Sequence, residues 1–338
     1  MQNKNKIILY VLLAAIAVFT VTFTIIRSPK PARIMAWIYP GKPACNAETE
    51  YSDGRKIDTL KSEYFLLSKD GVLTQLNLDT DGCNAYSPEN VTDLKKYSSE
   101  QYVTVSSSGS DPMNIFIDNS RTDPSEVNTL INFVKDNGFA GVELDFEGYS
   151  KWSGKTYANY KDFILSFGTA LHAAGKKLII DGPAMAGKLE EDETLWRYSD
   201  FSSLPLDGVI VLSYDYEVDH GIGNPISPFL WLKQVTEYVE SQFPDHSKII
   251  MGIPSYGYKA VLGDSDVTVL TLEQLQMESG FQNAHRDKSS GEMTWTDGQN
   301  VYFYQDPVTM TKKLKLLENL GISTVSVWHL GGNPWFLK

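Results

Sequence analysis

Cysteine is nearly absent from the chain, whose 338 residues contain only Cys45 and Cys83. Two distant cysteines offer too few ligands for a metal site, because structural zinc takes four. The histidines do not show the helical i, i+4 pairing that binds a metal from one helix face. They are His172, His220, His246, His285 and His329. We therefore expect no bound metal and no other cofactor.

Basic residues are outnumbered, with 30 Lys and Arg against 42 Asp and Glu, and the formal net charge is -12. No run of Lys and Arg appears beyond the N-terminus. Nucleic-acid binding depends mainly on neutralising phosphates, so we do not expect nucleic acid to be a partner. No internal repeat or low-complexity stretch stands out either. The length suits one large single-core domain or two small ones.

Only one long hydrophobic run is present, IILYVLLAAIAVFTVTFTII at residues 7–26. An uncharged run of this length can cross a bilayer as a helix. We expect a signal-anchor that stays in the mature protein and exports the C-terminal part of the chain. A small-x-small site at Ala15 and Ala17 lies inside the run, and a cleaved signal peptide or a buried core helix are the alternatives. The expected division is a cytoplasmic tip and membrane helix at 1–26, a linker at 27–33, and an exported domain at 34–338.

Beyond residue 33, apolar strand-like segments alternate with amphipathic helical segments. Strands are predicted at 33–41, at 64–68 or 72–76, and at 102–109, 141–148, 178–187, 206–217, 248–258 and 322–330. Helices are predicted at 125–138, 161–177, 228–243 and 309–321. About eight strands, most of them followed by a helix, indicate parallel βαβ units closed into a (β/α)8 TIM barrel. The polar segment 259–300 is predicted to be a short insertion before the last helix and strand.

The barrel also predicts how the two cysteines are used. Cys45 follows the first predicted strand and Cys83 follows the second. The loops after these strands should be neighbours on one face of the barrel, which brings the two thiols within bonding reach. In an exported protein we therefore expect a disulfide between them, with two unpaired thiols as the alternative.

The segment GVELDFEG, residues 141–148, has Glu143, Asp145 and Glu147 at every second position, with apolar residues between them. Successive side chains of a strand point to opposite faces, so the three acids share one face. In a barrel that face is the interior, and Glu147 comes at the C-terminal strand end, where catalytic groups of such barrels lie. Repulsion and desolvation should raise at least one pKa, which keeps a carboxyl protonated for general acid catalysis. Taken alone, the octapeptide also fits an edge strand with a solvated acidic face.

The stretch FAGVELDFEG resembles the fourth-strand signature D-G-x-D-x-D-x-E of family 18 glycoside hydrolases, the chitinase-like barrels. Asp145 and Glu147 match this signature, whereas Ala140 and Glu143 stand where the family has Asp. Further stretches agree in order: SSGS at 107–110, LSYDY at 212–216, GIPSYGY at 252–258, and VYFYQDPVTMTKKLKLLENLGISTVSVWHLG at 301–331, which holds Trp328. The last two are similar to the bacterial spore-wall branch of the family. The resemblance spans residues 34–335.

This resemblance implies substrate-assisted catalysis, in which the 2-acetamido group of the sugar is the nucleophile and no second carboxylate attacks. It implies that Glu147 is the general acid, that Asp145 orients the acetamido group, and that Tyr214 hydrogen-bonds the acetamido carbonyl. The expected substrate contacts are Asp215, Trp328, Glu143 and Tyr256.

The expected function is that of a membrane-anchored glycosidase outside the cytoplasm, at a bacterial cell surface. It should cleave β-1,4-linked N-acetylhexosamine glycans, either peptidoglycan or a chitin-like polymer, with retention of configuration. The alternative from another class is a non-catalytic, lectin-like glycan-binding protein on the same barrel. Some members of the family lose the acid and become lectins, so the presence of Glu147 favours the enzyme.

Overall fold

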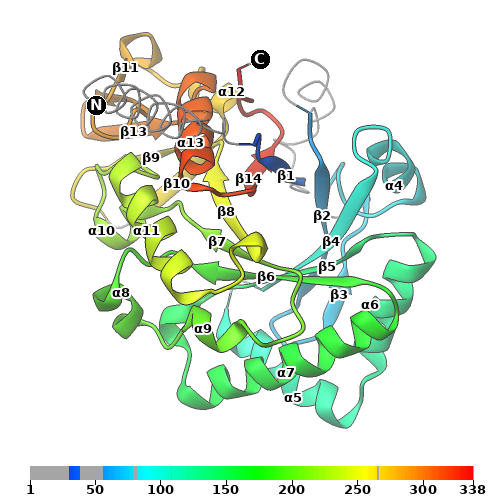
Figure 1. Ribbon diagram of the computed structural model, residues 1–338. Helices are drawn as coiled ribbons and strands as arrows, with labels where there is room; N and C mark the ends of the chain where they lie inside the picture. The colour runs from blue at the N-terminus through cyan, green and yellow to red at the C-terminus, as the bar shows by residue number, and fades with distance from the viewer. Residues whose placement is uncertain (1–29, 39–55, 79–81, 108, 265, 338) are drawn as a thin grey trace, which may run out of the picture. The chain divides into compact units, whose positions relative to one another are not determined.

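Eight parallel strands close into a barrel in this computed structural model, which describes residues 30–38, 56–78, 82–107, 109–264 and 266–337 (Figure 1). They are β1 (Arg33–Ile38), β2 (Thr59–Leu67), β4 (Glu100–Ser107), β5 (Gly141–Phe146), β6 (Lys177–Pro183), β7 (Gly208–Leu212), β8 (Ile249–Pro254) and β14 (Thr324–Leu330). Each pairs with the next in this order, and β14 pairs with β1 to close the ring. The predicted (β/α)8 barrel is confirmed.

Helices cover the outside of the barrel (Figure 1). They are α4 (Pro88–Leu94), α5 (Ser110–Thr122), α6 (Ser125–Asp136), α7 (Gly154–Ala173), α8 (Lys188–Glu193), α9 (Tyr198–Phe201), α10 (Tyr216–His220), α11 (Phe229–Gln242) and α13 (Pro307–Leu320). Val142, Leu144 and Phe146 of β5 lie in the apolar layer under these helices, where Phe146 meets Phe116 of α5 at 6.4 Å between ring centroids. The acids between them on β5 therefore point into the barrel.

The second strand is longer than predicted. β2 begins at Thr59. Its first part was not predicted, because Lys61 and Glu63 point into a polar barrel interior and interrupt the apolar pattern of the sequence. The other candidate segment is a strand as well: β3 (Leu73–Gln75) adds to β2 in the antiparallel direction.

Helix α7 also begins earlier than predicted, at Gly154. Ser153 caps it, since its side-chain oxygen accepts a hydrogen bond from the Thr156 backbone N–H at 3.1 Å. The polar residues of this first stretch hide the helical period in the sequence. The cap thus fixes a helix start that apolar spacing alone does not reveal.

The predicted insertion contains a sheet of its own, with strand order β10-β9-β13-β12-β11. Its elements are β9 (Gly257–Val261), β10 (Val267–Leu270), α12 (Leu272–Leu275), β11 (His285–Arg286), β12 (Met293–Asp297) and β13 (Asn300–Tyr304). Two small apolar clusters hold it together. One packs Tyr258 and Phe303 against Ile226, and the other stacks Trp295 on Tyr302 at 4.0 Å between ring centroids. The sheet was not foreseen, because antiparallel strands that are polar on one face have no continuous apolar run.

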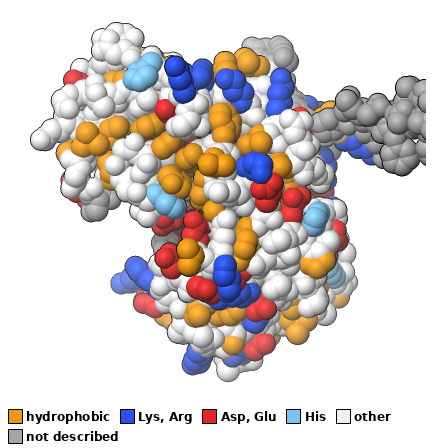
Figure 2. Space-filling model, turned by 60° about the vertical axis from the view of Figure 1, so that its left-hand side comes forward, with side chains coloured by type: hydrophobic (Ala, Val, Ile, Leu, Met, Phe, Trp, Pro, Cys, Tyr) orange, Lys and Arg blue, Asp and Glu red, His pale blue; other side chains and the backbone are white. Residues whose placement is uncertain are grey.

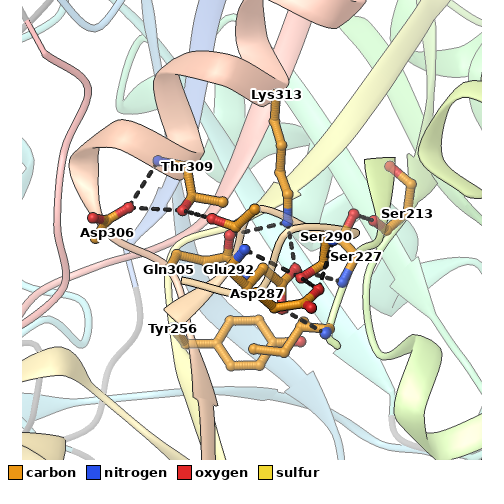
Figure 3. A network of polar contacts seen from close by, with 12 residues as sticks. Ser213, Ser227, Tyr256, Asp287, Ser290, Glu292, Gln305, Asp306, Thr309 and Lys313 are labelled. Carbon is orange, nitrogen blue, oxygen red and sulfur yellow. Dashed lines mark hydrogen bonds and ion pairs between the residues drawn. The ribbon is translucent and has the colours of Figure 1, made fainter. Parts of the chain in front are cut away.

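A buried ion pair joins the insertion to the barrel (Figure 3). Glu292, just before β12, lies 2.6 Å from the Lys313 ammonium of α13, and neither side chain is exposed. The same carboxylate accepts hydrogen bonds from the backbone N–H groups of Ile226 and Ser227, each at 2.8 Å. The Ser227 hydroxyl donates in turn to the Ser213 carbonyl at 2.8 Å. The insertion therefore fixes the segment that follows β7.

Two expectations fall outside the described residues. The predicted membrane helix at 7–26 is one of them, and within the described ranges no helix combines the length and the hydropathy needed to cross a membrane. Cys45 is the other, so its disulfide with Cys83 stays a prediction.

Candidate active site

Lys61 and Glu143 form a charged floor inside the barrel. The Lys61 ammonium lies 2.5 Å from Glu143 Oε1, and neither side chain is exposed. Trp37 Nε1 at 2.8 Å and the Thr104 hydroxyl at 2.5 Å donate to Glu143 Oε2. Burial lowers the pKa of Lys61, while the negative charges of Glu143 and Asp181 act to raise it. The neighbouring carboxylates therefore help the Lys61 amine to keep its proton, although burial favours the neutral form.

The expectation that Glu143 contacts the substrate does not agree with its position. Its carboxylate is fully buried, and donors from β1, β2 and β4 occupy both of its oxygens. It lines neither of the two cavities at the barrel mouth. Its side chain is one methylene longer than the family's Asp, and here it reaches the Lys61 ammonium on the floor instead of the cleft.

Asp145 lies one layer above Glu143 on β5. Strand pairing places Ser106 of β4 beside it. Burial raises the pKa of Asp145 well above its usual range, and the charges of Glu147 and Glu143 raise it further. Burial also raises the pKa of Asp181, on the neighbouring strand β6. The interior above the floor therefore disfavours two ionised carboxyls side by side.

Glu147 follows the end of β5 and opens into the cleft. Its backbone N–H donates to the Ser107 carbonyl at 2.9 Å, and its own carbonyl accepts from Trp152 Nε1 at 3.3 Å. The cleft walls keep water from the carboxyl and raise its pKa, and the charges of Asp215 and Glu63 raise it further. A positioned carboxyl whose pKa is raised in this way can act as a general acid.

Aromatic rings pack against one another at the ends of β7, β8 and β14, near the barrel mouth. Trp328 stacks on Tyr214 at 6.3 Å between ring centroids, and it meets Tyr256 edge-on at 4.9 Å. Asp215 follows Tyr214 and has a left-handed backbone, with φ 62°, which Asp adopts more readily than most residues. This wall offers an apolar ring face beside a phenol and a carboxyl, a combination that suits a sugar.

Tyr256 was expected to contact the substrate, but it lies behind the cleft wall. It is 1% exposed and lines neither cavity. Its hydroxyl donates to Asp215 Oδ1. Tyr256 therefore holds the Asp215 carboxylate in place from behind, and does not face a ligand directly.

Two cavities meet at Glu147, Tyr214 and Asp215, which line both. One has a volume of about 410 Å³ and extends along the loops that follow β5, β6 and β7. Its other ionisable lining residues are Glu190, Glu193, Asp219 and His220. Figure 2 shows acidic and histidine side chains gathered beside a hollow of the surface on this side. The cleft therefore continues away from Glu147 along an acidic wall.

The second cavity has a volume of about 340 Å³ and lies over β1, β2 and β4. Trp37, Glu63, Asp145 and Trp328 line it. Glu147 therefore lies where two connected spaces meet.

Four residues of this site were not found from the sequence: Trp37, Lys61, Glu63 and Asp181. Glu63 accepts a hydrogen bond from the Ser106 hydroxyl at 2.5 Å and lines the second cavity. Charged residues at alternate positions were the available signal, since Lys61 and Glu63 repeat the pattern of the acids on β5. In the described part of the chain, no cluster of His, Cys, Asp and Glu is arranged to hold a metal ion.

Comparison with known proteins identifies the family. The family model described as glycosyl hydrolases family 18 matches residues 37–333. The chain belongs to this family. Uncharacterized glycosylase YvbX of Bacillus subtilis is 28% identical over 215 residues, which are 60% of this chain and 60% of that protein. Cortical fragment-lytic enzyme of Bacillus subtilis is 22% identical over 220 residues, 61% of this chain and 49% of that protein.

The match thus spans only about half to three fifths of the length of these relatives. Among solved structures, a chitinase from Chromobacterium violaceum has a TM-score of 0.74 at 21% identity, over 89% of this chain and 95% of that one. The Bacillus cereus spore cortex-lytic enzyme SleL has a TM-score of 0.72 at 16% identity, over 90% and 72%. These likenesses show the shared fold. The predicted resemblance to family 18 and its spore-wall branch is confirmed.

Glu217, in α10, is a buried acid beside the site. It is 2% exposed, and no group among the described residues donates to its Oε2. Burial, followed by the charge of Asp215, raises its pKa to about 9. Because this pKa lies above the unfolded value of roughly 4.3, the contribution to stability is complete below about pH 4 and is lost as the pH rises toward 9.

We predict that Glu217→Gln raises the free energy of unfolding at pH 8 by about 1–3 kcal/mol and has less effect at pH 5, because the amide needs no proton to stay neutral. Urea unfolding at both pH values measures this difference. Glu273→Gln, at an exposed position of α12, is the control and should stay within about 0.5 kcal/mol. An equal effect of Glu217→Gln at the two pH values would contradict the predicted titration.

Proposed function

We propose that the protein hydrolyses β-1,4-linked N-acetylhexosamine glycans by substrate-assisted, retaining catalysis. The observation that carries this proposal is the position of Glu147: its carboxyl has a raised pKa and lies where two cavities meet, with Asp145 and Tyr214 beside it. This arrangement supplies an acid, an anion and a hydroxyl around one point in a cleft.

In the proposed reaction, Glu147 donates its proton to the glycosidic oxygen as the bond from C1 to that oxygen breaks. The carbonyl oxygen of the sugar's own acetamido group attacks C1 and forms a cyclic oxazolinium ion. The Glu147 carboxylate then takes a proton from the water that opens this ring, which restores the starting state. Two successive displacements at C1 give net retention of configuration.

The other residues act on the acetamido group and the sugar ring. Asp145, as an anion, offsets the positive charge of the oxazolinium ion and orients its N–H. The Tyr214 hydroxyl donates to the acetamido carbonyl, and Asp215 binds a sugar hydroxyl. Trp328 provides an apolar floor, since the half-buried indole borders the same cavity as Asp145. Charge placed where charge develops is the main source of such rate enhancement.

Two observations support a polymeric substrate. The cavities on either side of Glu147 measure about 410 and 340 Å³, a size in which sugar units can bind on both sides of the cut bond. The relatives include a cortical fragment-lytic enzyme, a spore cortex-lytic enzyme and chitinases. We propose peptidoglycan as the first substrate to test and chitin as the second.

We also propose that residues 7–26 form a membrane helix, retained in the mature protein, that places the barrel outside the cytoplasm. The uncharged run supports this proposal, because its length matches the thickness of a bilayer. Fractionation of cells that express the full chain should find it in the membrane pellet, while a chain that begins at Arg33 should stay soluble. A mature chain in the soluble fraction that starts after Ala17 or near Arg33 would instead indicate cleavage.

Replacing Glu147 by Gln keeps the shape of the side chain and removes the proton that it donates. We predict that Glu147→Gln still binds glycan, while turnover falls by about 10²-fold or more. Asp145→Asn should also reduce turnover strongly, because an amide does not offset the oxazolinium charge. Release of soluble sugars from purified peptidoglycan and from chitin oligosaccharides, with sizing of the products, measures both.

The matched control is Val142→Ala, on the opposite face of the same strand. It should lower the free energy of unfolding by about 1–3 kcal/mol and leave turnover nearly unchanged. An unchanged turnover in Glu147→Gln would refute the assigned acid. Glycan binding without hydrolysis by the unaltered protein would favour the lectin-like function.

A further inference from the structure

Asp181 is a buried carboxyl that takes no part in the reaction steps proposed above. It is fully buried on β6 between apolar residues, and no group among the described residues donates a hydrogen bond to either of its oxygens. A carboxylate in such a place loses its hydration without compensation, which costs several kcal/mol. Neutralisation by a proton is the usual way to avoid that cost.

Strand pairing brings Asp181 next to Asp145. Glu143 of β5 pairs with Ile179 of β6, and Leu144 pairs with Ile180, so the next residues are Asp145 and Asp181. Paired residues of parallel strands point to the same face, and Ile179 lies in the apolar cluster inside the barrel. Both carboxyls therefore lie side by side in the interior.

Two neighbouring carboxyls avoid mutual repulsion when one of them keeps a proton and donates it in a hydrogen bond to the other. Contact between the two carboxyls acts to lower the pKa of Asp145 and to raise that of Asp181, against a background of burial that raises both. The directions of these two effects correspond to a proton on Asp181, with Asp181 as the donor and Asp145 as the acceptor. A buried carboxylic acid that stays neutral in order to donate a hydrogen bond is a known device in active sites.

Glu143 does not compete for this role. Both of its oxygens already accept hydrogen bonds, from Lys61, Trp37 and Thr104. Neither oxygen is therefore placed to share a proton with Asp145. The other titratable groups that act on Asp181 or are affected by it are Lys61 of β2, Glu143 of β5, Tyr149, Tyr160 of α7, Tyr198 and Tyr214. Of these, Lys61 alone is cationic, and it lies on Glu143.

We propose that Asp181 is a positioning residue of the reaction: as a neutral acid it donates the hydrogen bond that holds Asp145 as an anion opposite the oxazolinium ion. This inference rests on the proposed function. The proton stays on Asp181 through the cycle, so no proton enters or leaves the pair. Glu147 alone exchanges protons with the leaving oxygen and with water.

Two substitutions at Asp181, with side chains of similar size, distinguish a role as hydrogen-bond donor from a role in packing alone. Asp181→Asn keeps a donor toward Asp145, so the full-length protein should keep its kcat within about threefold. Asp181→Leu fills the space without a donor and should lower kcat at least tenfold, with KM nearly unchanged. The matched control is Ser326→Ala, which removes a fully buried hydroxyl of β14 that has no partner among the described residues, and should behave like the wild type.

The pH dependence of the melting temperature tests the protonation of Asp181 without any substrate. A group whose folded pKa is raised stabilises fully below its unfolded pKa, near roughly 3.9, and loses this contribution as the pH rises. The melting temperature of Asp181→Asn should therefore exceed that of the wild type by several degrees at pH 8 and by less at pH 4. This measurement also keeps the proposal testable if Asp181→Leu fails to fold.

Three results would overturn the proposal: wild-type kcat in Asp181→Leu, an equal loss of kcat in Asp181→Asn and Asp181→Leu, or a constant difference in melting temperature from pH 4 to pH 8. A wild-type protein that hydrolyses none of the glycans would refute the proposed function instead. In that case the melting temperatures would still decide whether Asp181 is protonated.

Discussion

The buried ion pair between Lys61 and Glu143 is the interaction on which the rest of the site depends. Carboxyls of β5 and β6 share the barrel interior, and each charge brought there loses its hydration. The Lys61 ammonium is held between the Glu143 carboxylate and the face of Trp37, 3.0 Å from the ring centroid. Its field acts on the acids above it, because the surrounding medium screens charge poorly.

Depth in the barrel then separates the roles of the acids. Glu143 on the floor is neutralised by a fixed cation. Asp145, one layer higher, has no cation of its own and lies beside a second acid, Asp181. Glu147, at the rim, is reached by water only from the cleft, and its pKa is raised by burial and by neighbouring charge. One strand with acids at alternate positions thus gives three different electrostatic environments.

The insertion contributes the other wall of the site. Tyr256, just before the insertion's first strand, holds Asp215 through its hydroxyl, and Trp328 packs edge-on against the Tyr256 ring. The buried Glu292 carboxylate fixes the backbone at Ile226 and Ser227, beyond Asp215 in the chain. The position of Asp215 and Trp328 therefore depends on a sheet that lies outside the barrel.

The sequence allowed the barrel and the face of its acidic strand to be predicted, because both depend on local periodicity. Glu147 and Asp145 were found for this reason. Lys61 was missed because a charged residue inside a strand breaks the apolar pattern by which strands are recognised. The partner of Glu143 was not foreseen either, since Lys61 lies 82 positions earlier in the chain.

Asp181 shows the same limit from another direction. The segment that contains Asp181 was correctly predicted to be a strand, but the role of Asp181 depends on which residue of β5 lies beside it. Strand register inside a closed barrel is set by the packing of the whole ring, and periodicity within one segment does not contain it. The insertion's sheet was hidden for a related reason, because its strands are short and polar on one face.

The most direct test of this account is the free energy of unfolding of Lys61→Met, alone and combined with Glu143→Gln. Removal of the cation leaves a buried carboxylate unpaired, so the single variant should lose about 3–5 kcal/mol. The double variant should recover most of that loss, because the amide carries no charge. A loss below about 1 kcal/mol in Lys61→Met, or no recovery in the double variant, would contradict the central role of this ion pair.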